Sequence, residues 1–210
     1  TGAFSECSSL SSITIPDSVT EIGNHAFCNC ALLAEVKISS SIVSIGDYAF
    51  NKCSSLIKVS LPSSLKQIGK GVFKSCGSLS EVTIDSQLIE IPSNTFNDCK
   101  SLSKISIPPT VKKIKGCAFE KCFKLTEIEI PSSVEDIGND SFRECKSLQQ
   151  IIIPSSVKFI DMFAFYGCQS ATKVEIKSPL TSINHHVFQK CSSLKEIVIP
   201  STVKFIGIGA

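Results

Sequence analysis

The stretch "IPSSVEDIGNDSFRECKSL", residues 130–148, carries the pattern from which the fold of this 210-residue chain can be predicted. It holds one cysteine, Cys145, with no metal-binding or redox partner near it in the sequence. The preceding stretch "IPPTVKKIKGCAFEKCFKL" (107–125) and the following stretch "IPSSVKFIDMFAFYGCQSA" (153–171) carry a cysteine at the same place. Cys145 is therefore one member of a repeated unit, and its role follows from the role of that position in every unit.

The repeat has a constant period of 23 residues, and no insertion interrupts it. A small or short residue, most often alanine, precedes each phenylalanine of the unit. The period predicts a single domain, residues 1–210. Because the chain starts and stops inside a unit, we interpret it as a fragment of a longer array. The repeated cysteines are Cys7, Cys30, Cys53, Cys76, Cys99, Cys122, Cys145, Cys168 and Cys191, and the repeated phenylalanines are Phe4, Phe27, Phe50, Phe73, Phe96, Phe119, Phe142, Phe165 and Phe188.

Each unit reads as two short strands followed by a tight turn. Residues 10–15 follow the pattern Leu10-x-x-Ile13-x-Ile15, whose alternating second half has the period of a strand with one buried face. Pro16 lacks the N–H needed for a ladder and ends that strand, and residues 19–22 form a second short strand. Phe27 and Cys30 lie three apart, on one face of a helical or 3₁₀ turn. Since one unit cannot bury its apolar residues alone, the pattern predicts a repeat solenoid of about nine coils with a parallel sheet on one face.

A glycine column separates the second strand from the phenylalanine turn. Gly23 begins this column, and Asp161 and Asn184, which tolerate a positive φ, replace glycine in two later units. Pro92 also stands in the column, and its ring forbids a positive φ. We therefore expect that this turn does not have one fixed left-handed geometry in every coil.

Composition limits the class of protein. Hydrophobic residues make up 42% of the chain and charged residues 19%, which provides a sizeable core. The formal net charge of +2 gives no strong electrostatic field and argues against a nucleic-acid partner, because such proteins usually present a basic face. No apolar run approaches the roughly 18 residues of a membrane helix, so we expect no membrane insertion within this segment.

Three interpretations of the cysteine column compete. Disulfides suit a secreted chain, but equivalent residues on stacked coils point the same way, with Cβ atoms about 4.8 Å apart instead of roughly 3.5–4.5 Å. A structural zinc site needs four converging ligands, whereas a column spreads them along the rod, so we expect no metal. We favour the third interpretation, that these cysteines are small buried hydrophobic residues. Cys28 and Cys117 lie outside the column, and we expect at least one of them to be exposed and reactive.

The unit LxxIxIPxSVxxIGxxAFxxCxSL resembles the BspA-like leucine-rich repeats, and the resemblance covers the whole chain. This family occurs in surface proteins of anaerobic bacteria and of parasitic protists such as trichomonads. The resemblance implies a β-rich leucine-rich repeat solenoid. For function it implies a cell-surface or secreted protein that binds host matrix proteins or host cells. Local departures such as Ala171 for leucine and Lys115 for glycine would loosen single turns only.

Charged residues of alternating sign follow the coils along the expected sheet. We interpret these columns as cross-strand ladders that keep the rod in solution and in register. One column runs Ser12, Glu35, Lys58, Glu81, Lys104, Glu127, Gln150, Lys173 and Glu196, and shorter ones run Lys112, Glu135, Lys158 and Glu90, Lys113, Asp136.

Large apolar residues occupy usually polar positions in the last coils. Such residues at solvent-facing positions can mark an interface, and the alternative is that they bury against a longer array, a cap or one another. Both interpretations stay open, and our hypothesis is that Phe159 and Phe163 contact a partner. Asn139 opens the sole glycosylation sequon. The candidate partner-binding residues are Ile152, Phe159, Met162, Phe163, Tyr166, Val198 and Phe205.

Catalytic residues are not evident. The histidines are His25 and the adjacent pair His185 and His186, and no nucleophile–histidine–acid set can be assembled from their spacing. We therefore expect a non-enzymatic protein-binding module without a cofactor, acting in adhesion at the cell surface. The alternative is an intracellular structural or scaffold protein of the cytoplasm, since eleven cysteines also suit a reducing compartment.

Overall fold

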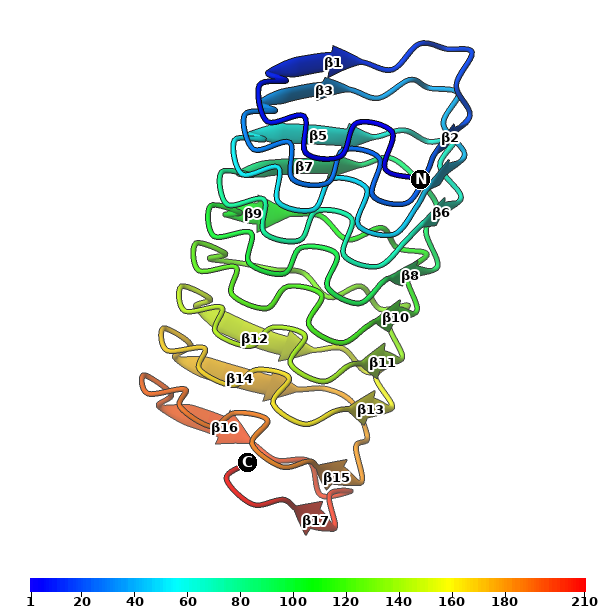
Figure 1. The fold of residues 1–210 in the computed structure, drawn as a ribbon. Coiled ribbons are helices and arrows are strands. Elements are labelled where there is room, and N and C mark those ends of the chain that lie inside the picture. Colours follow the sequence, from blue (N-terminus) through cyan, green and yellow to red (C-terminus); the bar gives the residue numbers. More distant parts are fainter.

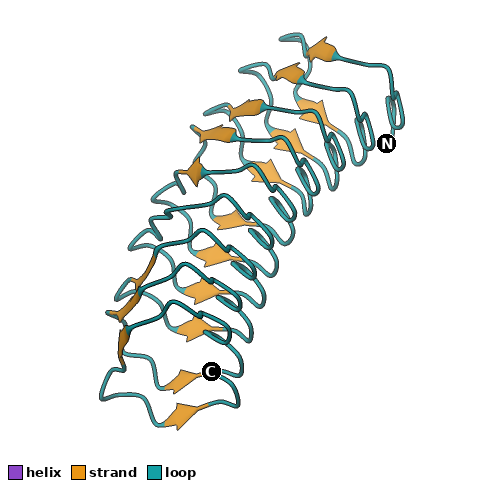
Figure 2. Ribbon diagram, turned by 90° about the vertical axis from the view of Figure 1, so that its left-hand side faces the viewer, coloured by secondary structure: helices purple, strands orange, loops and turns teal.

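The computed structural model describes residues 1–210, which wind into one β-solenoid of 23-residue repeats. Figure 1 shows the coils stacked along one axis, with two rows of short strands on different sides of each coil. In Figure 2 the stack forms an arched rod with the termini at opposite ends. The predicted repeat solenoid is confirmed. Its parallel strands pair with a shift of one repeat, as Ser12 with Glu35 and Ile13 with Val36 show.

The first row of strands comes from the alternating segment of each repeat. Their inward residues enter the core and their outward residues are solvated, which is why a period of two appears in the sequence. Pairing divides the row into a five-stranded and a three-stranded parallel sheet. The strands are β1 (Ser12–Thr14), β3 (Glu35–Lys37), β5 (Lys58–Leu61), β7 (Glu81–Ile84), β9 (Lys104–Ile105), then β12 (Gln150–Ile153), β14 (Lys173–Ile176) and β16 (Glu196–Val198).

The second row consists of two-residue strands, each with an outward residue followed by an isoleucine. These isoleucines are buried in every strand of the row except the last one, where Ile206 is exposed. The strands are β2 (Glu21–Ile22), β4 (Ser44–Ile45), β6 (Gln67–Ile68), β8 (Glu90–Ile91), β10 (Lys113–Ile114), β11 (Asp136–Ile137), β13 (Phe159–Ile160), β15 (Ser182–Ile183) and β17 (Phe205–Ile206).

The phenylalanine turn is not helical, so the expected helical or 3₁₀ turn is wrong. Its alternate backbone N–H groups donate to the next coil instead of back along a helix, as in Phe27 N–H to Ala49 O (2.8 Å) and Asn29 N–H to Asn51 O (2.7 Å). Two positions in each turn have a positive φ, such as His25 (54°) and Asn29 (62°). The residues with positive φ change the direction of the chain between successive tight turns. The hydrogen bonds between neighbouring coils take the place of the bonds that a helix would make within itself.

The glycine column differs from these left-handed positions. None of the residues in this column has a positive φ. The residues with positive φ lie two and six positions further along each coil. Glycine is favoured there by close approach between coils. A Cβ on Gly46 would lie 2.6 Å from the backbone nitrogen of Asn24, and one on Gly138 would lie 2.7 Å from that of Gly116. The column therefore has no left-handed geometry in any coil, and Pro92 fits it without a positive φ.

The core is one continuous cluster of 56 buried residues that runs through the rod. At its centre the repeated phenylalanine rings form a spine, with neighbouring ring centroids 5.1–5.8 Å apart and planes within 18° of parallel. Phe4, in the first coil of the structure, is 45% exposed, whereas the rings from Phe50 to Phe165 are fully buried between two neighbours. Each interior coil is thus stabilised by its two neighbours.

Candidate protein-binding surfaces

The cysteine column is buried as predicted, and it also makes a contact that was not predicted. All eleven cysteines are free thiols, and in the column only Cys7, in the first coil, is exposed. The sulfur of Cys145 lies 3.2 Å from the carbonyl oxygen of Phe119 in the preceding coil, and that carbonyl also accepts the N–H of Cys122 at 3.2 Å. Cysteine suits this site because it packs as a small hydrophobic residue and supplies a donor. The other cysteines that make this contact are Cys30, Cys53, Cys76, Cys99, Cys122, Cys168 and Cys191.

The two cysteines outside the column are half-buried. Burial and the neighbouring Glu120 raise the pKa of Cys117 to about 12. At neutral pH this thiol is protonated, which disfavours Cys117 as a nucleophile. Cys28 lies 3.5 Å from the side-chain amide of Asn51, and its reactivity stays a prediction.

The charged columns pair with themselves, as the sequence predicted. On the first row of strands Lys104 lies 2.7 Å from Glu127, and Lys58 pairs with Glu81. On the second row Lys113 and Asp136 are 3.0 Å apart. Their side chains are largely exposed, so each pair contributes little to stability, and paired charges offer little to a ligand.

The seven candidate partner-binding residues fall into three groups on different segments of the coil. On the first row of strands, Ile152 and Val198 are separated by Glu175, which pairs with both. On the second row, Phe159 and Phe205 are 46% and 50% exposed. In the turn segment, Met162 is exposed and Phe163 and Tyr166 are half-buried. Phe159 therefore lies on a strand and Phe163 in a turn, so a partner that contacts both side chains would have to cover both segments.

Phe163 and Tyr166 belong to an aromatic cluster capped by cations. The Phe163 ring stacks on His186 with centroids 4.6 Å apart and meets Tyr166 edge-on at 5.8 Å. The Arg143 guanidinium lies 4.9 Å from the Tyr166 ring centroid, and Lys190 lies 5.1 Å from it. Arg143, His186 and Lys190 lie about one repeat away from these rings along the chain. Their contacts can be recognised in the sequence only when the phenylalanine turns of neighbouring repeats are aligned.

The sequon residue Asn139 is exposed, and its amide lies 3.1 Å from Asp140. Its glycosylation stays a prediction. The described chain brings together no group of three or more His, Cys, Asp or Glu side chains in metal-binding geometry. No helix in the structure has the length and apolarity to cross a membrane.

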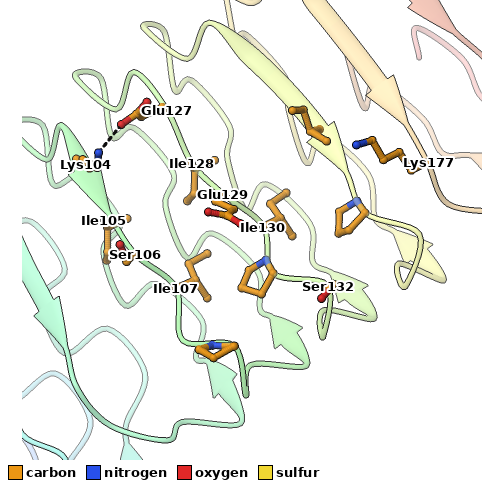
Figure 3. A pocket seen from close by; sticks show the side chains of 14 residues that line it. Lys104, Ile105, Ser106, Ile107, Glu127, Ile128, Glu129, Ile130, Ser132 and Lys177 are labelled. Atoms are coloured by element: carbon orange, nitrogen blue, oxygen red, sulfur yellow. Dashed lines mark ion pairs between the residues drawn. The ribbon is translucent and has the colours of Figure 1, made fainter.

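A groove crosses the first row of strands, and sequence reasoning missed it. Residues 127–130 occupy the place of a strand between β9 and β12 but pair with neither neighbour. The resulting groove has a volume of about 860 Å³. Figure 3 shows Ile107, Ile128 and Ile130 along it, together with the carboxylate of Glu129. The repeat pattern of residues 127–130 is normal, so no local signal in the sequence indicated the interruption.

Comparison with protein families identifies the repeat. The model for the "BspA type Leucine rich repeat region" matches in six copies, over residues 1–126 and 112–210. The chain therefore belongs to the BspA-type leucine-rich repeat family, as the resemblance implied. Proteins built from leucine-rich repeats typically serve as non-catalytic binding modules.

Solved structures of bacterial leucine-rich repeat proteins share the fold. One from Bacteroides ovatus is 26% identical with a TM-score of 0.72, covering 100% of this chain and 66% of the other. A leucine-rich cell-surface protein from Faecalibacterium prausnitzii is 24% identical with a TM-score of 0.61, covering 100% and 62%. The leucine-rich repeat protein of T. pallidum is 26% identical with a TM-score of 0.58, covering 94% and 73%. The chain thus spans about two thirds of the length of the first two proteins. A search of curated proteins found no match.

Proposed function

We propose that this chain is a non-enzymatic protein-binding module that acts in adhesion to host cells or extracellular matrix at the cell surface. The observation that carries the proposal is the match to BspA-type repeats along the whole chain. The rod itself supports it, because stacked coils present broad faces to a protein partner. Several large apolar side chains, including Phe159 and Phe205, stand exposed on these faces.

A capture experiment tests this proposal. The purified chain is cross-linked to host matrix and host-cell extract, and in parallel to extract of the source organism. The proposal expects enrichment of a host matrix or host surface protein over a heat-unfolded sample of the same chain. Capture of the organism's own structural proteins alone would contradict it.

The second candidate is an intracellular scaffold role in the cytoplasm. The observation that favours it is the presence of eleven free thiols, eight of them buried, which a reducing compartment preserves. The same capture experiment separates the two functions by the source of the enriched protein.

Phe159 offers a direct test of the apolar residues on the second row. We expect Phe159→Asp to weaken capture of the enriched partner several-fold, because an exposed apolar contact would be replaced by a charge. The melting temperature should stay nearly unchanged, since Phe159 is 46% exposed. Gln67→Asp, at the equivalent exposed position of β6, is the matched control. A large loss of stability in Phe159→Asp would instead place this side chain in the core.

A further inference from the structure

We propose that the groove at the sheet interruption binds an extended segment of a partner protein in which apolar and basic side chains alternate. This inference rests on the proposed function, because it names the site and the kind of segment through which the module would hold its partner. Three features of the groove support it: free backbone donors, an uncovered core residue and one unpaired charge.

The first feature is the backbone. The N–H groups of Ser106 and Ile107, and those of residues 128–130, make no hydrogen bond within the chain. Nearer the N-terminus in the same row, by contrast, β5 and β7 pair over four residues, from Lys58 with Glu81 to Leu61 with Ile84. Free main-chain donors inside a sheet are paired by water or by an incoming strand, and addition of an extended peptide to such groups is a recurrent mode of recognition.

The second feature is Ile128, which stands in a column of core residues but is only half-buried. Along this column the first and last members are also incompletely covered, as expected at the ends of a stack. Ile128 lies in the middle of the rod, so its exposure comes from the open sheet. An apolar side chain of a docked segment would cover it. Its buried counterparts are Val36, Val59, Val82, Ile105, Ile151 and Val174, each 1–7% exposed.

The third feature is the charge of the groove. Of the charged residues that line it, Lys104 pairs with Glu127 at 2.7 Å, and Lys177 pairs with Glu175 at 3.6 Å. Glu129 is exposed and makes no ion pair. The uncompensated charge is therefore negative, and it selects a basic side chain in the docked segment.

Peptide titration tests the inference. The probe is a fluorescein-labelled peptide of alternating lysine and valine, and its glutamate–valine counterpart is the comparison. Ser106→Trp fills the groove, whereas Ser60→Trp places the same side chain at the equivalent exposed position of β5, where the sheet is closed. We expect the basic peptide to bind the wild-type chain and Ser60→Trp equally, and to bind Ser106→Trp about tenfold more weakly.

A charge reversal provides a second variant that does not depend on how Ser106→Trp folds. Glu129→Lys should weaken the basic peptide about tenfold, while Glu35→Lys on β3, the control on the same row, should have no effect. Amide hydrogen exchange should show protection of residues 106–107 and 127–130 when the peptide is added. Unchanged exchange there, equal binding to Ser106→Trp, or equal binding of the acidic peptide would each overturn the inference.

The capture experiment separates this inference from the proposed function. If Ser106→Trp and the wild-type chain capture the same host protein equally, the function stands and the groove is not its site. If the wild-type chain captures no host protein, the function fails, and the peptide titration still decides whether the groove binds an extended segment.

Discussion

At the scale of single residues, the phenylalanine and cysteine columns are linked by hydrogen bonds between neighbouring coils. The ring of Phe119 lies between those of Phe96 and Phe142, with centroids 5.4 and 5.3 Å away. Its carbonyl oxygen accepts the N–H of Cys122 and lies 3.2 Å from the sulfur of Cys145. The same two residue types therefore fill the core and satisfy a buried acceptor between coils.

The position of a phenylalanine in the spine should determine its contribution to stability. We expect Phe119→Ala to lower the free energy of unfolding by about 3–5 kcal/mol, because a fully buried ring leaves a cavity. Phe4→Ala should cost much less, since Phe4 is 45% exposed and has one neighbouring ring. Urea unfolding of both variants measures this difference, and equal costs would contradict the continuous spine.

The buried thiols should make the rod sensitive to alkali. Burial raises the pKa of Cys53 to about 12, so the folded state favours the protonated thiol. Stability is then complete below the thiol pKa of the unfolded chain. As pH rises from about 9 towards 12 the unfolded state loses the proton first, and each such thiol removes up to about 1.4 kcal/mol per pH unit.

Chemical unfolding over this pH range under reducing conditions measures the slope. Cys53→Ala should make the slope shallower, because one titrating group is removed. A stability that does not fall above pH 9 would contradict the burial of the column.

The sequence predicted which cysteines are buried but not the bond from their sulfur. Column membership followed from the 23-residue step, and burial followed from the hydrophobic character of a free cysteine at a regularly repeated position three residues after each phenylalanine. The acceptor carbonyl lies 26 residues earlier in the chain, as in Cys145 and Phe119. A contact of this kind depends on how coils are offset, which the period alone does not specify.

At the scale of elements, the strands followed from the sequence and the turn did not. Alternation of apolar and polar residues identified the first row, and short β-branched segments identified the second. A spacing of three between Phe27 and Cys30 is shared by a helical turn and by a series of tight turns. The backbone N–H groups decided between them by bonding to the next coil, as Phe27 does to Ala49.

The left-handed residues of the turn provide a test of this geometry. Lys52 is exposed and has a φ of 61°, a conformation that costs a non-glycine residue about 1–2 kcal/mol. Glycine removes this cost but adds roughly 0.5–1 kcal/mol of chain entropy, so Lys52→Gly should stabilise the rod by up to about 1.5 kcal/mol. Thermal unfolding checks this expectation.

Lys66→Gly is the matched control, because Lys66 is exposed but does not have a positive φ. This substitution should destabilise the rod by roughly 0.5–1 kcal/mol. If both substitutions destabilise the rod equally, the described turn is wrong.

At the scale of the whole molecule, the arrangement of the surface depends on the stack. The sequence singled out large apolar residues in the last coils, and the structure places Ile152, Phe159 and Phe163 on different segments of the coil. The groove could not be predicted, because residues 127–130 keep the normal pattern and only their pairing with β9 and β12 is lost. Hydrogen-bond pairing between coils depends on how the coils stack in the folded rod, and the sequence of one coil does not specify it.

The most direct measurement of the proposed function is adhesion by the isolated chain. Beads coated with the folded chain are passed over host cells and over immobilised matrix proteins, next to beads coated with the heat-unfolded chain. We expect the folded chain to retain several-fold more beads on at least one of these surfaces. Equal retention of the two bead types on every surface would contradict an adhesive role.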